Sequence, residues 1–320
     1  MTDSLSLLRH AVSAYSDHFG DTRLLPLAIA LGLHLLSLLI RSGVWCGILR
    51  AAFPEREVKL RPTVWAYLAG AGANAVAPLR GGDLVRISAI RRHLPGASLA
   101  TIISTLVAET VFGVVMVVAM ATATVSLGWL PPLVQLPNGQ AFEFSFYARN
   151  VTSVALALGL LALVTVLLAK WAAHHLLGVW RRLAQGLRIL RSPGRFARVV
   201  ALPQLVDWTL RVGTAYALLA AFGLPTAVRY ALLVVVVDSV STALPFTPGG
   251  IGAQQGLLVF ALGGAATSSQ VLAFSIGAQA VILAFNVVLG LIAVFALFGH
   301  VRVGSLHHDA GHWAKSEPSR

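Results

Sequence analysis

Long apolar runs separated by short polar segments fill the chain between residues 24 and 298. Each long run reaches the roughly 20 residues that an α-helix needs to cross the hydrocarbon core of a membrane. A transmembrane barrel would instead show short segments of alternating polarity. The pattern therefore predicts an all-α polytopic integral membrane protein. The runs cover residues 24–49, 97–127, 149–169, 199–222 and 270–298.

Two further apolar segments, residues 62–78 and 230–246, are at the short limit for a membrane span. Each leads into a break that contains proline and a glycine pair, "PLRGG" from Pro78 and "PFTPGG" from Pro245, and then into a second limb. Unwound backbone is tolerated in a membrane only where it lines a protein-enclosed or wet cavity. The pattern favours about five full spans plus two broken or re-entrant hairpins, and about seven or eight ordinary spans are the alternative.

The distribution of Lys and Arg predicts the orientation of the chain. Residues 50–61 and 170–198 collect many of these basic side chains, and both segments are expected to be cytoplasmic. The basic segment 170–198 also has the mixture of apolar and basic residues typical of a helix lying on an anionic leaflet. The connection 126–148 has no Lys or Arg and is expected to face outward.

By the same count, the first short hairpin enters the membrane from the cytoplasm and the second enters from outside. Residues 62–127 and 230–298 would then form two units of opposite orientation. Inverted repeats with helices broken near the midplane recur in transporters. We expect one flippase-like transmembrane domain over residues 24–298, with polar tails at 1–23 and, in the cytoplasm, at 299–320.

Composition agrees with this class and argues against others. Hydrophobic residues make up 57% of the chain, charged residues only 11%, and the mean hydropathy is +0.79. The formal net charge of +12 is explained by orienting arginines in loops, so no nucleic-acid partner is expected. The single cysteine, Cys46, excludes an intrachain disulfide. The sequence has no phosphate-loop, HExxH or GxSxG motif, and we expect no enzyme activity, cofactor or metal.

Charged residues nevertheless fall inside the predicted membrane segments, where an uncompensated charge costs several kcal/mol. Arg80, Asp83 and Arg86 recur every three residues and share one face of the first return limb, which begins at a glycine pair. After internal pairing this face keeps a positive charge, and free backbone N–H groups lie beside it. These features predict an anion site, with a lipid phosphate as the natural anion. The alternative is that both arginines only snorkel to the cytoplasmic surface.

The remaining charges in these segments have different interpretations. Asp207 and Arg211 stand at i and i+4 and are expected to neutralise each other. Glu109 and Asp238 have no obvious local partner, so a transport-pathway role and a plain interhelical hydrogen bond are both open. An intramembrane aspartyl dyad of Asp83 and Asp238 is disfavoured, because the neighbouring arginines would hold Asp83 ionised.

Two stretches carry a family resemblance. "NAVAPLRGGDLVR" (74–86) and "LPFTPGGIGAQQG" (244–256) resemble signatures of the lysylphosphatidylglycerol synthase transmembrane-region family, the flippase-like domain of multiple-peptide-resistance-factor proteins. The resemblance covers nearly the whole chain and implies a membrane domain for lipid translocation. The chain departs from the family pattern at Asp83, where Glu is usual, at Thr110, where Arg is expected, and at Gln255, where an acid is usual.

The spacing of the residues and the resemblance together give a predicted site. The lipid head-group residues are expected to be Asn74, Arg80, Gly81, Gly82, Asp83, Arg86, Gly249, Gly250 and Gly252. The pathway or coupling residues are expected to be Glu109, Asp238 and Gln255. The structural breaks are expected at Pro78, Pro245 and Pro248.

The sequence therefore predicts a flippase that moves an anionic or phosphate-bearing lipid, either a phospholipid or a polyisoprenyl-type lipid, in a bacterial-type cytoplasmic membrane. One alternative is a noncatalytic accessory subunit of an envelope-lipid or glycolipid synthesis system. Its partner would be a lipid-modifying synthase or glycosyltransferase. The other alternative is an intramembrane phosphatase or transferase that acts on a lipid head group, because an arginine site also suits phosphoryl chemistry.

Overall fold

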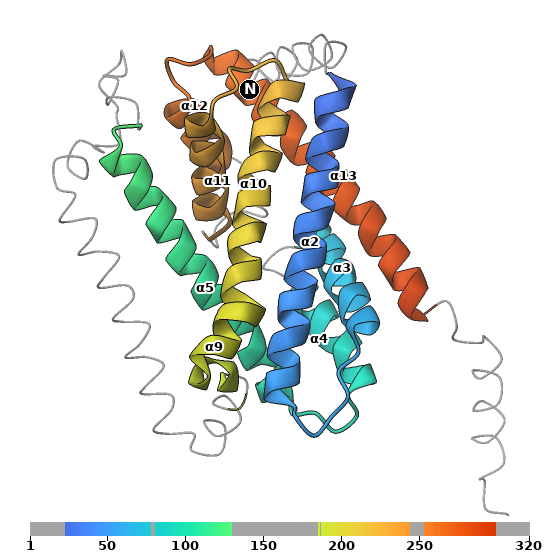
Figure 1. Cartoon of the computed structure of the whole chain (residues 1–320). Coiled ribbons are helices and arrows are strands. Elements are labelled where there is room, and N and C mark those ends of the chain that lie inside the picture. Colours follow the sequence, from blue (N-terminus) through green and yellow to red (C-terminus); the bar gives the residue numbers. More distant parts are fainter. Residues whose placement is uncertain (1–22, 78–80, 130–184, 186, 244–252, 299–320) are drawn as a thin grey trace, which may run out of the picture.

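The structure is a computed structural model, and it describes residues 23–77, 81–129, 185, 187–243 and 253–298. Every regular secondary-structure element in these ranges is a helix (Figure 1). The long helices are α2 (Leu24–Ala52), α5 (Leu99–Ser126), α10 (Leu202–Ala221) and α13 (Ser268–Phe298). The short helices are α3 (Leu60–Val76), α4 (Gly81–His93), α11 (Val228–Ala243) and α12 (Ala253–Ala261). A 3₁₀ turn (Arg188–Arg191), the helix α9 (Pro193–Phe196) and a π turn (Ala197–Ala201) lead into α10.

Helices α2, α5 and α13 are long and apolar enough to cross a membrane. Their 28 to 31 residues correspond to about 42 to 47 Å of helix, which exceeds the thickness of a hydrocarbon core of about 30 Å. They coincide with the predicted runs at 24–49, 97–127 and 270–298, and α10 coincides with the run at 199–222. The prediction of an all-α membrane protein is confirmed. The run at 149–169 lies outside the described residues.

Helices α3 and α4 form a closely packed pair. A Cβ atom at Gly82 would overlap the carbonyl oxygen of Gly70 and lie 2.5 Å from the backbone nitrogen of Asn74, so only glycine fits this crossing. Helix α3 stops at the break because Ala77 has an extended backbone (φ −88°, ψ 131°). A following proline, here Pro78, favours that conformation.

Helices α11 and α12 form a second pair. In Figure 1 the α3–α4 pair lies toward the end of the bundle where α2 passes into α3. The α11–α12 pair lies toward the opposite end, where α2 begins. Each pair is followed along the chain by a long helix, α5 after α4 and α13 after α12. This arrangement is the one expected for two opposed re-entrant hairpins.

Helix α2 lies between α3 and α10. It packs against α3 on one side and along α10 on the other (Figure 1). Helix α13 crosses α3 where Gly72 and Gly290 meet, and a Cβ atom at Gly72 would lie 2.5 Å from the Cα atom of Gly290. Close backbone packing of this kind replaces the hydrophobic effect as the main source of helix association in lipid. The side chains of α2 are therefore positioned to reach α3, α10 and α13.

The positions of the two helix pairs at opposite ends of the bundle give a testable topology (Figure 1). Single cysteines at Glu55, exposed between α2 and α3, and at Thr226, exposed between α10 and α11, are expected to lie on opposite faces of the membrane. The background is Cys46→Ala, since Cys46 is the chain's one cysteine. A membrane-impermeant maleimide should label the Thr226→Cys protein in intact cells and the Glu55→Cys protein only after permeabilisation. Labelling of both from the same side would contradict the arrangement.

Candidate functional site

Glu109 is the centre of a buried polar cluster. It lies on α5 and is 8% exposed. Arg86 of α4 donates from Nη2 to Glu109 Oε2 at 2.6 Å, and the Tyr67 hydroxyl of α3 donates to Oε1 at 3.0 Å. Arg41 of α2 places its Nε 3.7 Å from the same Oε1 atom. One carboxylate therefore joins α2, α3, α4 and α5. We call Arg41, Trp45, Tyr67, Arg86 and Glu109 the Glu109 cluster.

The guanidinium group of Arg86 is held between two aromatic rings. Its central carbon lies 3.9 Å from the centroid of the Trp45 ring and 4.1 Å from that of Tyr67. The indole N–H of Trp45 donates to the hydroxyl of Thr105 at 3.0 Å, which fixes the ring. Cation–π contacts in a site without water stabilise a cation by about 2 kcal/mol or more. Arg86 is thus fixed in position by stacking as well as by its ion pair.

Arg41 differs from Arg86 in its exposure. The Arg41 side chain is 29% exposed, compared with 8% for Arg86. Arg41 and Glu109 each lie about 5 Å along the axis from the midpoint of their long helices, at about 1.5 Å per residue. This places the cluster at the depth of the hydrocarbon core. Arg41 is the most exposed residue of the Glu109 cluster.

A second polar cluster lies nearer the start of α2. Asp207 of α10 accepts a hydrogen bond from Ser37 and lies 3.7 Å from Nε of Arg211, so the predicted i, i+4 pair is confirmed. His34 Nε2 lies 3.0 Å from Asn286 Oδ1 of α13. We call these five residues the Asp207 cluster. It ties α2 to α10 and α13, as the Glu109 cluster ties α2 to α3, α4 and α5.

The described parts of the two signatures lie at helix ends: residues 74–77 at the end of α3, residues 81–86 at the start of α4, and residues 253–256 at the start of α12. The family model described as Lysylphosphatidylglycerol synthase TM region matches residues 6–290. This chain belongs to that family. No curated protein and no solved structure matches the chain. Membership indicates a role connected with membrane lipids.

In this member of the family, the first signature contributes Arg86 to the Glu109 cluster. Arg86 is buried and points to Glu109, so the interpretation in which it snorkels to the surface is wrong. Its partner in the described ion pairs is Glu109 and not Asp83, which is half-buried in the first turn of α4. The expectation of a free N–H at Gly82 is also wrong, because that group donates to Asn74 Oδ1 at 2.8 Å. Asn74 therefore holds the start of α4 against α3.

The second signature of the family member joins α11, α12 and α13. Gln254 donates from Nε2 to Asp238 Oδ1 at 3.3 Å, and Gln255 donates from Nε2 to Gln279 Oε1 at 2.9 Å. Asp238 and Gln255, both predicted as pathway residues, thus take part in contacts between helices. The following predicted residues lie outside the described ranges: Pro78, Arg80, Pro245, Pro248, Gly249, Gly250 and Gly252.

Sequence reasoning missed the residues that α2 contributes. His34, Ser37, Arg41 and Trp45 follow one another at spacings of three and four, which places them along one face of a helix. Polar residues within a membrane span usually face the protein interior. The spacing of these residues is therefore a signal, additional to the apolar length of the run, that this face of α2 lines a functional site.

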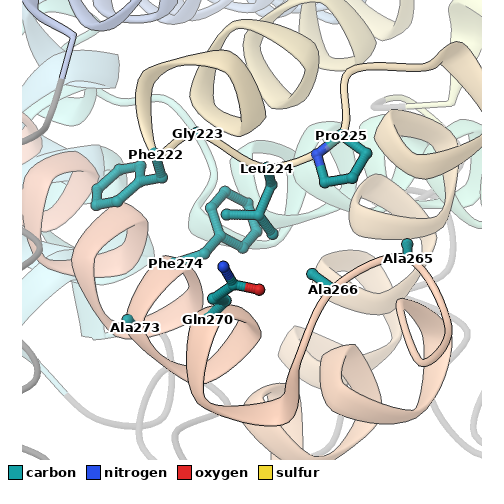
Figure 2. Close-up of a pocket in the computed structure, with 9 residues that line it drawn as sticks. All are labelled: Phe222, Gly223, Leu224, Pro225, Ala265, Ala266, Gln270, Ala273 and Phe274. Carbon is teal, nitrogen blue, oxygen red and sulfur yellow. The ribbon is translucent and has the colours of Figure 1, made fainter.

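A pocket of about 250 Å³ lies elsewhere, where the turn between α10 and α11 meets the start of α13 (Figure 2). None of the described residues that line it is charged, and Gln270 accepts hydrogen bonds from Thr267 beside it. A pocket without a charged side chain does not suit a lipid phosphate. Its lining residues are Phe222, Gly223, Leu224, Pro225, Ala265, Ala266, Gln270, Ala273 and Phe274.

Proposed function

We propose that this membrane domain moves an anionic or phosphate-bearing lipid between the two leaflets, and that it does so without covalent catalysis. The observation that carries the proposal is that Arg41 and Arg86 share one carboxylate, that of Glu109, which lies near the midpoint of the membrane-length helix α5. Two positive charges and one negative charge leave one positive charge uncompensated within the cluster. A lipid phosphate would neutralise it and accept charge-assisted hydrogen bonds.

The cluster also has hydrogen-bonding capacity for a ligand. Among the described residues, Arg86 Nε is buried and has no hydrogen-bond partner. A buried donor without an acceptor costs about 1 to 3 kcal/mol. A phosphate that reaches the cluster past the more exposed Arg41 would offer oxygen acceptors to both guanidinium groups. Arginine suits this role because its planar group of donors matches the geometry of a phosphate.

The arrangement of the helices supports movement between leaflets. In the proposed mechanism, the head group occupies a groove between the α3–α4 and α11–α12 pairs, while the acyl chains stay in the bilayer. Helix α2 packs against α3 of the first pair and against α10, which contacts α11 of the second pair, and it carries His34, Ser37 and Arg41 on one face. Polar groups therefore extend from the Glu109 cluster toward the second pair. Rocking of one repeat against the other would expose the head group to each leaflet in turn.

The proposed substrate is a phospholipid or a polyisoprenyl-type lipid of a bacterial-type cytoplasmic membrane. The proposed protein partner is a lipid-modifying synthase or glycosyltransferase that supplies or uses this lipid.

The two alternative functions, an accessory subunit and a head-group enzyme, would give different results in a lipid-transport experiment. An accessory subunit moves no lipid by itself, and a head-group phosphatase or transferase changes the mass of the lipid that it is given.

The proposal predicts that Arg41 is required for transport. Fluorescent phosphatidylglycerol and phosphatidylcholine are reconstituted with the purified protein in proteoliposomes, and movement between leaflets is measured by quenching. Arg41→Gln should slow movement of the anionic lipid roughly 10- to 100-fold, because it removes a charge-assisted contact worth about 1.5 to 3 kcal/mol. Arg41→Lys should restore only part of the rate, since an ammonium group lacks the planar set of donors.

Arg91→Gln is the matched control, because Arg91 is an exposed arginine in the last turn of α4, away from the Glu109 cluster. This variant should transport at the wild-type rate. Wild-type protein that moves neither lipid under any ion gradient would contradict the proposed function. Equal rates for the wild-type and Arg41→Gln proteins would contradict the assignment of the site alone.

A further inference from the structure

His34 is a titratable side chain near the midpoint of the membrane-length helix α2. It lies about 6 Å along the axis from the midpoint of α2, at about 1.5 Å per residue, and is half-buried. Its Nε2 atom lies 3.0 Å from Asn286 Oδ1, and its ring lies edge-on to Phe285 with 6.2 Å between centroids. Histidine is the side chain that ordinarily changes charge between about pH 5 and 8, and histidines within transport proteins often carry protons.

The charges that face His34 come from two helices. On α2 itself Arg41 follows seven residues later on the same face, and α10 presents Asp207 and Arg211. Helix α13 has no charged residue and contacts His34 through Asn286 and Phe285. Asp207 already accepts from Ser37 and pairs with Arg211. A proton on His34 would therefore add a third positive charge near two arginines, with one carboxylate that is already paired.

We propose that His34 is a proton-binding site and that its proton and the lipid anion bind together. This inference rests on the proposed function of the Glu109 cluster. A phosphate at Arg41 adds negative charge two helical turns from His34 and offsets the repulsion that a protonated imidazole meets. Binding of the anion therefore favours binding of the proton. By thermodynamic reciprocity, binding of the proton favours binding of the anion by the same factor.

The contact between His34 and Asn286 also links the proton to the packing of α13. The side chain of Asn286 meets His34, and its backbone carbonyl oxygen would lie 2.7 Å from a Cβ atom at Gly72. Asn286 thus lies where α13 crosses α3, the first helix of the α3–α4 pair. A protonated imidazole donates from both ring nitrogens and needs a second acceptor. Protonation therefore changes the hydrogen bonding at the crossing that positions the hairpin.

The test measures binding of phosphatidylglycerol to the detergent-solubilised full chain at about pH 5.5 and about pH 8. Wild-type protein should bind it more tightly at the lower pH by roughly tenfold, within the usual range of coupling between sites. The same protein should take up protons when the lipid binds, as recorded with an indicator dye in weak buffer. Phosphatidylcholine, which has no net charge, should give a smaller proton uptake.

His34→Gln keeps a hydrogen-bonding amide near Asn286 but cannot be protonated. It should bind phosphatidylglycerol with equal affinity at both pH values and take up no proton. His93→Gln is the control, because His93 is exposed at the end of α4 and its described hydrogen bond is to the Ala89 carbonyl of its own helix. This variant should behave as wild type.

Wild-type protein that binds the lipid without proton uptake would overturn the proton site while leaving the proposed transport function standing. The same conclusion follows if the His34→Gln variant keeps the wild-type pH dependence. Wild-type protein that binds no anionic lipid at either pH overturns both proposals. Proton uptake is measured on the wild type alone. Its absence would therefore overturn the proton site even if His34→Gln fails to fold.

Discussion

Replacing Glu109 with glutamine is expected to lower the free energy of unfolding by roughly 3 to 5 kcal/mol. Glu109 and Arg86 form a buried pair whose side chains are 9% and 8% exposed. Removal of the carboxylate charge leaves the Arg86 guanidinium buried without a counter-charge, and Arg41 loses the same partner. Desolvation of an unpaired charge is costly, and in a membrane bulk water does not reach it.

Equilibrium unfolding in mixed micelles measures this loss. Glu57→Gln is the matched control, because Glu57 and Lys59 form an exposed ion pair with N and O atoms 3.8 Å apart. The control should change the free energy by less than about 1 kcal/mol. The double variant Glu109→Gln and Arg86→Gln should recover part of the loss, because it removes the buried positive charge. Equal effects of Glu109→Gln and Glu57→Gln would show that the buried ion pair does not hold the helices together.

The second large effect is expected at Gly82. Leucine at this position should destabilise the protein by at least about 3 kcal/mol and stop transport, because overpacking forces backbone to move. Its Cβ atom would overlap the carbonyl oxygen of Gly70 and lie 2.5 Å from the backbone nitrogen of Asn74. Backbone atoms cannot rotate away as a side chain can. Helix α4 would have to separate from α3 and would carry Arg86 away from Glu109.

Gly113→Leu is the control for this substitution. Gly113 lies within α5, and a Cβ atom there would have no neighbour within 4 Å. Thermal unfolding in detergent and lipid movement in proteoliposomes should both be near wild type for this variant. If the Gly82→Leu protein matches it in both measurements, the crossing of α3 and α4 is not as tight as the structure shows.

Much of the fold can be predicted from the sequence because membrane insertion depends mainly on the length and polarity of each segment. The apolar runs predict α2, α5, α10 and α13, and the two short runs with their glycine and proline breaks predict the pairs α3–α4 and α11–α12. The crossing of α3 by α13 at Gly72 and Gly290 could not be predicted. Packing between distant helices depends on shape, which has no fixed spacing along the chain.

The candidate site was predictable only where partners are close in sequence. Asp207 and Arg211 lie one helical turn apart, so their pairing follows from helix geometry. Arg86 and Glu109 are both predicted site residues, but their ion pair spans a loop and two helices. The contribution of Arg41 depends on how α2 is rotated against α5. No local pattern in a single sequence predicts this rotation.

We propose that a lipid phosphate binds at the Glu109 cluster through Arg41 and Arg86. Native mass spectrometry of the purified protein tests this binding, with the number of retained phosphatidylglycerol molecules counted for the wild type, Arg41→Gln and Arg91→Gln. The wild type and Arg91→Gln should retain this lipid, and Arg41→Gln should lose it at a collision energy at which the others keep it. Equal retention by all three proteins would show that Arg41 does not bind the lipid.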